Sequence, residues 1–402
     1  MSVQTELTDW SMIANALVEA EKDVVSTVPR VESPLFRAEG HRYLARMFAA
    51  GALTQLEAHD PAYPQLVPFV STWVTWGGTN PDSDYLYAAV HPDYTYRLRG
   101  RRGSVHLFAV ETFAGDFNDM MKIQACGMGL DVIGGPSNLS FGPDGEVDIV
   151  LSQKEHEGNW VPIPDVPGHV LLRFCYYDWE VGDRPELVIE REGADYPPPP
   201  VTAEELECRL GLLLEFIRQG PQTCARAAEM YFAGDPGSVR FPPWSLEETA
   251  DYDRQLSFRD QLYGQGHYTL DDGEVVLLES TVPVSSYWSF NLSSPYLENS
   301  DWHLRQNSIN GHQAVVAADG RFRAVIAHED PGVPNWLDTG RRPIGIIQAR
   351  FLRPSAMPEV SLRTLPADRV RDALPVDTPV VSPRERQESV RRRILAVQRR
   401  GH

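Results

Sequence analysis

The residues best suited to chemistry lie late in the chain, in a His-x-Asp pair and the loop that follows it. His328 has the side chain that titrates near neutral pH, and Asp330 stands two residues on, so the pair predicts acid–base catalysis. We predict that Asn335 donates to a developing oxyanion and that Arg305 and Arg350 hold a carboxylate or sulfate. The alternative is structural, because Asp-Pro-Gly forms turns and Asn335 is equally suited to holding its own loop.

A second polar group lies in the Gly-Gly-Thr-Asn-Pro region ahead of the first predicted strands. Asp82 is predicted to be an acid–base residue there, with Asn80 and Tyr85 as substrate contacts. The alternative is a turn whose backbone groups are hydrogen-bonded by its own Asn and Asp side chains. Arg173 lies within a predicted strand and needs a carboxylate if it is buried, for which the acidic residues at positions 178 and 180 are candidates.

Aromatic residues are concentrated in the same segments, which predicts an apolar mouth between two β domains that suits a ring-shaped or otherwise hydrophobic small molecule. Trp179, Trp288 and Trp336 are expected among its substrate contacts. The competing interpretation is an ordinary sandwich core. The aromatic residues are Trp73, Trp76, Tyr85, Tyr87, Trp160, Tyr176, Tyr177, Trp179, Trp288, Trp302 and Trp336.

No motif for a nucleotide, flavin or catalytic zinc is present, and the four cysteines have no C-x-x-C spacing. A His-x-Asp pair at a strand end is half of an iron-binding facial triad, but the later histidine that such a site needs is here only His402. We therefore predict no metal and no organic cofactor. A net charge of −19 argues against nucleic-acid binding, and the absence of a long apolar run predicts a cytoplasmic protein without integral membrane contact.

Hydrophobic periodicity predicts a mainly β protein with helical additions (α+β), in which two antiparallel β-sandwich or jelly-roll-like domains are joined by a helical segment. Within that segment, Gly220-Pro221 is expected to end one helix, and residues 246–263 are expected to form another. Sheet edges that need covering suggest a homo-oligomer. The expected segments are residues 1–65 (helical), 66–196 (first β domain), 197–264 (helical linker), 265–355 (second β domain) and 356–402 (an irregular tail with a basic helix).

Five separated motifs resemble the domain-of-unknown-function 1214 family: Tyr287-Trp-Ser-Phe-Asn-Leu, Arg305-Gln-Asn-Ser-Ile-Asn, Asp319-Gly, Asp330-Pro-Gly-Val-Pro-Asn-Trp-Leu and Arg350-Phe. Upstream, Asn80-Pro-Asp-Ser-Asp-Tyr is loosely similar to an element of the companion 1254 family, with Ser83 where that element has asparagine. The resemblance implies β-sandwiches of jelly-roll type and supplies no activity. Our leading hypothesis is a cofactor-independent hydrolase or lyase acting on a hydrophobic metabolite such as a lipid, steroid or terpenoid. The alternatives are a non-catalytic binding protein and an oligomeric scaffold.

Overall fold

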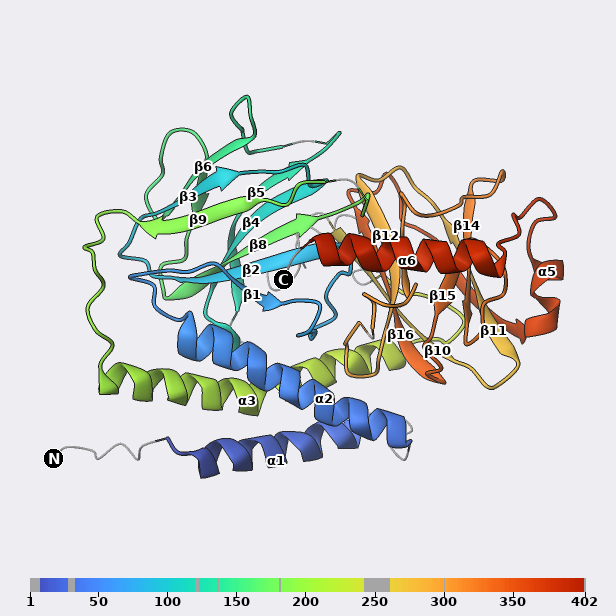
Figure 1. Cartoon of the computed structure of the whole chain (residues 1–402), viewed down its shortest axis with the longest axis horizontal. Helices are drawn as coiled ribbons and strands as arrows, with labels where there is room; N and C mark the ends of the chain where they lie inside the picture. The colour runs from blue at the N-terminus through green and yellow to red at the C-terminus, as the bar shows by residue number, and fades with distance from the viewer. Residues whose placement is uncertain are drawn as a thin grey trace.

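The computed structural model describes residues 8–27, 33–119, 123–135, 137–180, 182–241, 261–299 and 301–400. These residues form four β-sheets and five α-helices, with the sheets in two side-by-side units (Figure 1). The predicted mainly β class is confirmed. Among the described residues, no helix is long and apolar enough to cross a membrane.

The first unit is a sandwich of two sheets, here called A and B. Alternating residues of the strands, such as Phe108 and Leu172 from sheet A and Leu98 and Ile149 from sheet B, fill the core between them. The strands pair antiparallel except for β6 with β7. Sheet A has the order β1 (Val67–Val70), β2 (Ser83–Val90), β8 (Gly168–Cys175), β4 (Leu107–Ala114) and β5 (Gln124–Val132), and sheet B the order β7 (Trp160–Pro162), β6 (Glu146–Ser152), β3 (Tyr96–Arg101) and β9 (Glu186–Arg191).

The second unit is also a two-sheet sandwich, with sheets C and D around the aromatic residues Trp288, Phe290, Phe322 and Phe351. Among its described strands, only β14 and β15 pair in parallel. Sheet D has the order β10 (Gln261–Thr269), β16 (Ile344–Leu352), β12 (Tyr287–Ser293) and β13 (Ser308–Asn310), and sheet C the order β15 (Trp336–Asp338), β14 (Arg321–Ala327), β11 (Glu274–Thr281) and β17 (Val360–Pro366).

Strand β17 corrects the expected boundary of the second β domain, because residues 356–366 were assigned to an irregular tail. Val360 and Leu362 face the core between sheets C and D, and β17 pairs along its whole length with β11. Apolar and polar residues alternate from Val360 to Arg363, and the pattern breaks at Thr364, after which Leu365 packs on the outer face of sheet C. The short helix α5 (Val370–Ala373) follows and packs Val370 on the outer face of sheet C.

Helices α1 (Trp10–Thr27), α2 (Pro34–Gly51) and α3 (Ala203–Phe232) lie together along one side of the molecule, and helical residues of all three pack with the outer face of sheet A (Figure 1). Helix α3 continues through Pro221, so the predicted helix end at Gly220-Pro221 was wrong. A Cβ on Gly220 would lie 2.7 Å from Met47 Cε, so this glycine serves close packing of α2 on α3 rather than a stop. Of the helix predicted at 246–263, residues 246–260 lie outside the described residues. Residues 261–263 are not helical and form the start of β10.

Helix α6 (Pro383–Arg399) spans from the second unit towards the first (Figure 1). Three buried arginines hold it, spaced seven residues apart and so on one helix face. Arg386 pairs with Asp330 at 3.0 Å, and Arg393 donates to Trp302 O at 3.1 Å. Arg400, just past the helix end, donates to Pro81 O at 2.8 Å.

Candidate functional site

The structure does not bring the sequence-predicted acid–base residues together. His328 Nδ1 lies 2.6 Å from Thr339 Oγ1, whereas the Asp330 carboxylate is held by Arg386 of α6. Both residues line a hollow of about 460 Å³ at the edge of sheet C. Asp330 thus anchors α6 and does not orient His328.

Asn335 and Arg305 also have structural partners. Asn335 Nδ2 donates to Val315 O at 2.7 Å and Arg323 O at 2.8 Å, and its Oδ1 accepts from Val315 N at 2.9 Å. Its amide is therefore fully used in holding the loop. Arg305 pairs with Asp338 at 2.9 Å and is half-exposed. Neither residue is placed to act with His328.

The two tryptophans predicted beside these residues are buried in different places. Trp288 lies within the core between sheets C and D, where it stacks on Phe351 and meets Phe322 edge to face. Trp336 packs on the outer face of sheet C, and its Nε1 donates to Ala327 O at 3.2 Å. Both positions favour the structural alternative for these residues.

The second predicted group, around Asp82, is a closed junction between the two units. Asp82 is 1% exposed and accepts hydrogen bonds from Tyr287 Oη, from Trp179 Nε1 at 2.6 Å and from Asn310 Nδ2 at 2.9 Å. Asn80 Nδ2 donates to Tyr287 Oη at 2.8 Å. Burial, followed by the Asp82 charge, raises the pKa of Tyr287 well above its ordinary value, so its hydroxyl stays a donor. Asp82 is therefore enclosed by its own hydrogen-bond partners, and its predicted acid–base role stays a prediction.

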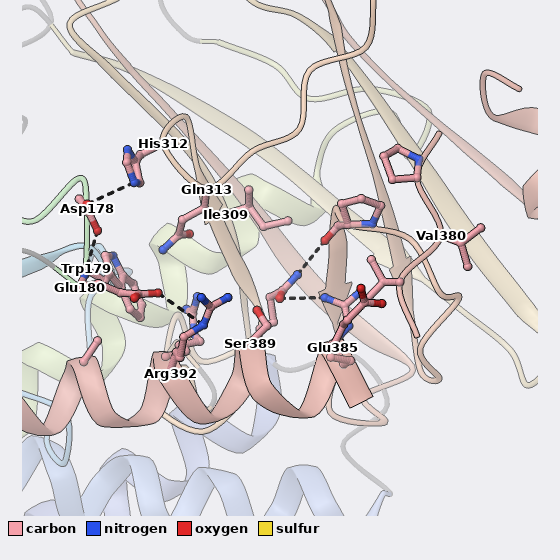
Figure 2. A pocket seen from close by; sticks show the side chains of 17 residues that line it. Asp178, Trp179, Glu180, Ile309, His312, Gln313, Val380, Glu385, Ser389 and Arg392 are labelled. Atoms are coloured by element: carbon pink, nitrogen blue, oxygen red, sulfur yellow. Dashed lines mark hydrogen bonds and ion pairs between the residues drawn. The ribbon is translucent and has the colours of Figure 1, made fainter. Parts of the chain in front are cut away.

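The groove beside α6, about 540 Å³ in volume, is lined by charged residues that pair with one another (Figure 2). Asp178 lies 3.4 Å from His312, and Glu180 lies 3.6 Å from Arg392. Trp179 lines this groove too. An open surface lined by charged side chains in ion pairs is poorly suited to a hydrophobic ligand. Within the part of the chain that the structure describes, no cluster of three or more His, Cys, Asp or Glu is suited to hold a metal ion.

A smaller hollow, which we call the sheet A cavity, has the character expected of a ligand site. Its volume is about 290 Å³, and its walls are mostly buried and apolar. It lies against the outer face of sheet A, with walls from α3, the loop at residues 77–79 and Leu297 of the second unit. The lining residues are Phe69, Val70, Trp76, Gly77, Thr79, Tyr85, Phe113, Phe117, Ile123, His169, Leu171, Arg173, Thr223, Cys224, Ala227 and Leu297.

Strand β8 supplies the floor and the two most polar residues of this cavity. His169, Leu171 and Arg173 alternate along it and therefore face the same side of sheet A. Phe113 of β4 is in register with His169, and Tyr85 of β2 with Arg173. Phe69 and Phe117 stack on each other over this face, with ring centroids 5.1 Å apart.

His169 is held as a neutral ring of one tautomer. Its Nδ1 lies 2.9 Å from Gly115 O, a carbonyl that only accepts, so Nδ1 carries the proton. Burial lowers the pKa of His169, which the nearby Asp116 charge partly opposes. The ring packs against Phe113, Phe117 and Tyr87. Nε2 is consequently an acceptor, and within the described residues nothing donates to it.

Arg173 belongs to a polar cluster at the junction of sheets A and D. Its guanidinium lies 3.2 Å from Glu111, 5.4 Å from the centre of the Tyr85 ring, and hydrogen-bonds to Tyr263. Burial raises the pKa of Glu111, which Arg173 opposes. Arg350, next to Tyr263 in sheet D, donates to Asn291 and to Gly78 O, both uncharged. With both arginines and Glu111 charged, the cluster has a net charge of +1.

Sequence reasoning placed only part of this site. Of the predicted ligand contacts, Tyr85 lines the cavity, as does Trp76 among the other aromatics. Glu111, rather than an acidic residue at 178 or 180, pairs with Arg173. His169 was missed, although its alternation with Leu171 and Arg173 was a usable signal. Most of the residues predicted to be catalytic lie in loops, because loops commonly carry function, whereas His169 lies within a strand.

Comparisons with known proteins agree with the fold and supply no activity. The model of the family described as "Protein of unknown function (DUF1214)" matches residues 124–178 and 257–356. The 1214 part of the sequence resemblance is confirmed over these residues, which include Arg173, Tyr263 and Arg350. Nothing in the comparisons supports the likeness of the N-terminal region to the 1254 family. No curated protein matches the sequence.

Two of the solved structures that match the chain illustrate the likeness. The crystal structure of an uncharacterized protein from Burkholderia cenocepacia is 26% identical, covers 89% of this chain and 97% of that one, and superposes with a TM-score of 0.82. That protein therefore shares the arrangement of both units. A protein from Vibrio parahaemolyticus is 12% identical over 86% of this chain and 100% of that one, with a TM-score of 0.45.

Proposed function

We propose that the protein binds a small, mostly apolar molecule in the sheet A cavity. The observation that carries this proposal is the combination of aromatic walls with few polar groups in a hollow of about 290 Å³ whose lining residues are mostly buried. Scaling from the ~150 Å³ cavity that accepts benzene, the ligand has roughly 12 non-hydrogen atoms. That size favours a single-ring compound over a whole steroid.

Calorimetric titration with indole and with cinnamic acid tests the proposal, and a ligand of this size is expected to bind with a micromolar dissociation constant. Ala227 on α3 lines the cavity, so Ala227→Leu fills part of it and should weaken binding at least about tenfold. The matched control is Ala203→Leu at the exposed start of the same helix, which should bind normally. If both variants fold and bind like the parent protein, the ligand is not in this cavity.

A catalytic function of acid–base type is the second candidate, and the geometry of His169 favours it. A neutral imidazole with an available Nε2 has the form of a general base. If bound compounds are chemically changed, mass spectrometry will detect turnover that His169→Asn abolishes. Binding without turnover would favour a non-catalytic binding protein over an enzyme.

A further inference from the structure

The two most polar residues of the sheet A cavity lie apart along strand β8. His169 and Arg173 are four residues apart on the same strand face, which places their Cα atoms roughly 13 Å apart at the usual rise of a strand. Leu171 lies between them as an apolar floor. A ligand that satisfies both ends must therefore be polar at both ends and apolar in the middle.

The Arg173 end is suited to an anion. About 14% of the Arg173 side chain is exposed, which leaves part of it open to the cavity. A bound carboxylate would accept charge-assisted hydrogen bonds from the Arg173 guanidinium, which lines the cavity, in a partly buried place.

The His169 end is suited to a hydrogen-bond donor. Gly115 O fixes the proton on Nδ1, so Nε2 presents a lone pair. A ligand hydroxyl or N–H that reached it would gain a bond in an environment with little competing water. Aromatic rings of Phe69, Phe117 and Trp76 stand along the wall between the ends, which suits a flat ring.

We propose that the cavity recognises a hydroxyaryl carboxylic acid or a molecule of the same chemistry: an acid at Arg173, a ring over Leu171 and a hydroxyl at His169. This inference rests on the proposed function and specifies its ligand class. A phenylpropenoic acid with a ring hydroxyl has about the number of atoms that the cavity volume allows.

Titration calorimetry with four probes tests it: 4-hydroxycinnamate, cinnamate, 4-hydroxycinnamamide and cinnamamide. For the parent protein, loss of the hydroxyl should weaken binding about three- to tenfold, and loss of the charge about ten- to a hundredfold. In His169→Asn, whose amide still donates to Gly115 O, the hydroxyl should no longer matter. His169→Gln, with an acceptor near the Nε2 position, should restore part of that preference.

Arg173→Gln alone would leave Glu111 buried without its partner, so the variant to use is Glu111→Gln with Arg173→Gln. In it, the charged and amide probes should bind alike. If cinnamamide binds the parent protein as tightly as 4-hydroxycinnamate, the inference is overturned while the apolar cavity stands. If neither the four probes nor indole binds the parent protein, both the inference and the proposed function fail.

Discussion

Replacing Asp82 by asparagine should loosen the junction of the two β units. The asparagine oxygen can still accept from Trp179 and Asn310, but each bond loses roughly 1 kcal/mol because its acceptor is no longer charged. The amide N–H then faces Tyr287, whose hydroxyl has to turn towards Asn80 Oδ1 at 3.2 Å. Burial lowers the pKa of Arg393 to about 9 and Asp82 opposes that shift, so Arg393 also loses its compensating charge. The expected loss of stability is about 3–4 kcal/mol in total.

Urea unfolding followed by tryptophan fluorescence measures this loss, since Trp179 lies in the junction. With a denaturant slope of ~2–3 kcal/mol per molar, the midpoint should fall by about 1–2 M. Asp178→Asn makes the same chemical change at a partly exposed carboxylate and should shift the midpoint by less than ~0.3 M. Equal shifts for Asp82→Asn and Asp178→Asn would show that the Asp82 charge does not hold the junction.

Three further predictions follow from single contacts. Gly78 has φ +66°, and a Cβ there would lie 2.5 Å from Gln348 Nε2, whereas Gly77 has φ +67° and no atom within 4 Å of its Cβ position. Urea unfolding should therefore show a larger loss of stability for Gly78→Ala than for Gly77→Ala, because only the first adds a clash to the backbone strain. Equal losses would contradict this reasoning. Arg386→Met should destabilise by about 1–3 kcal/mol because it removes the pair with Asp330 and the hydrogen bonds to Gln306 and to Val333 O. The exposed Arg391→Met should cost under ~0.5 kcal/mol, and a neutral Arg386→Met would show that α6 does not depend on these contacts. Because burial lowers the pKa of His169 in the folded state, the unfolded state binds more protons below about pH 6.5. The free energy of unfolding should therefore decrease by up to ~1.4 kcal/mol for each unit by which the pH is lowered. His169→Gln should make this pH dependence less steep, and an unchanged dependence would refute the prediction.

The strands of both sandwiches were largely predictable because alternation follows directly from the pleat of a half-buried strand. The site was not, because it depends on which strands become neighbours. Glu111 and Arg173 meet only because β4 and β8 pair in a particular register. Asp330 looked like a partner of His328 by sequence proximity, yet Arg386, 56 residues later, takes it. Short-range spacing cannot reveal such pairings, since the competing partner comes from a distant part of the chain.

The contacts of the α6 arginines also mean that part of the first sandwich is completed only when the end of the chain has been synthesised. Arg400 reaches back over 319 residues to Pro81, and its guanidinium lies 4.3 Å from the centre of the Trp179 ring. At ~5–20 residues per second, a ribosome needs on the order of 15–60 s to make the chain between Pro81 and Arg400. Trp179 is made within that period, and Arg400 follows it by 221 residues, which takes roughly 10–45 s at the same rate. Until then the Trp179 ring and the Asp82 carboxylate to which it donates lack their contact with Arg400, so the nascent first sandwich exposes an aromatic surface that it later buries.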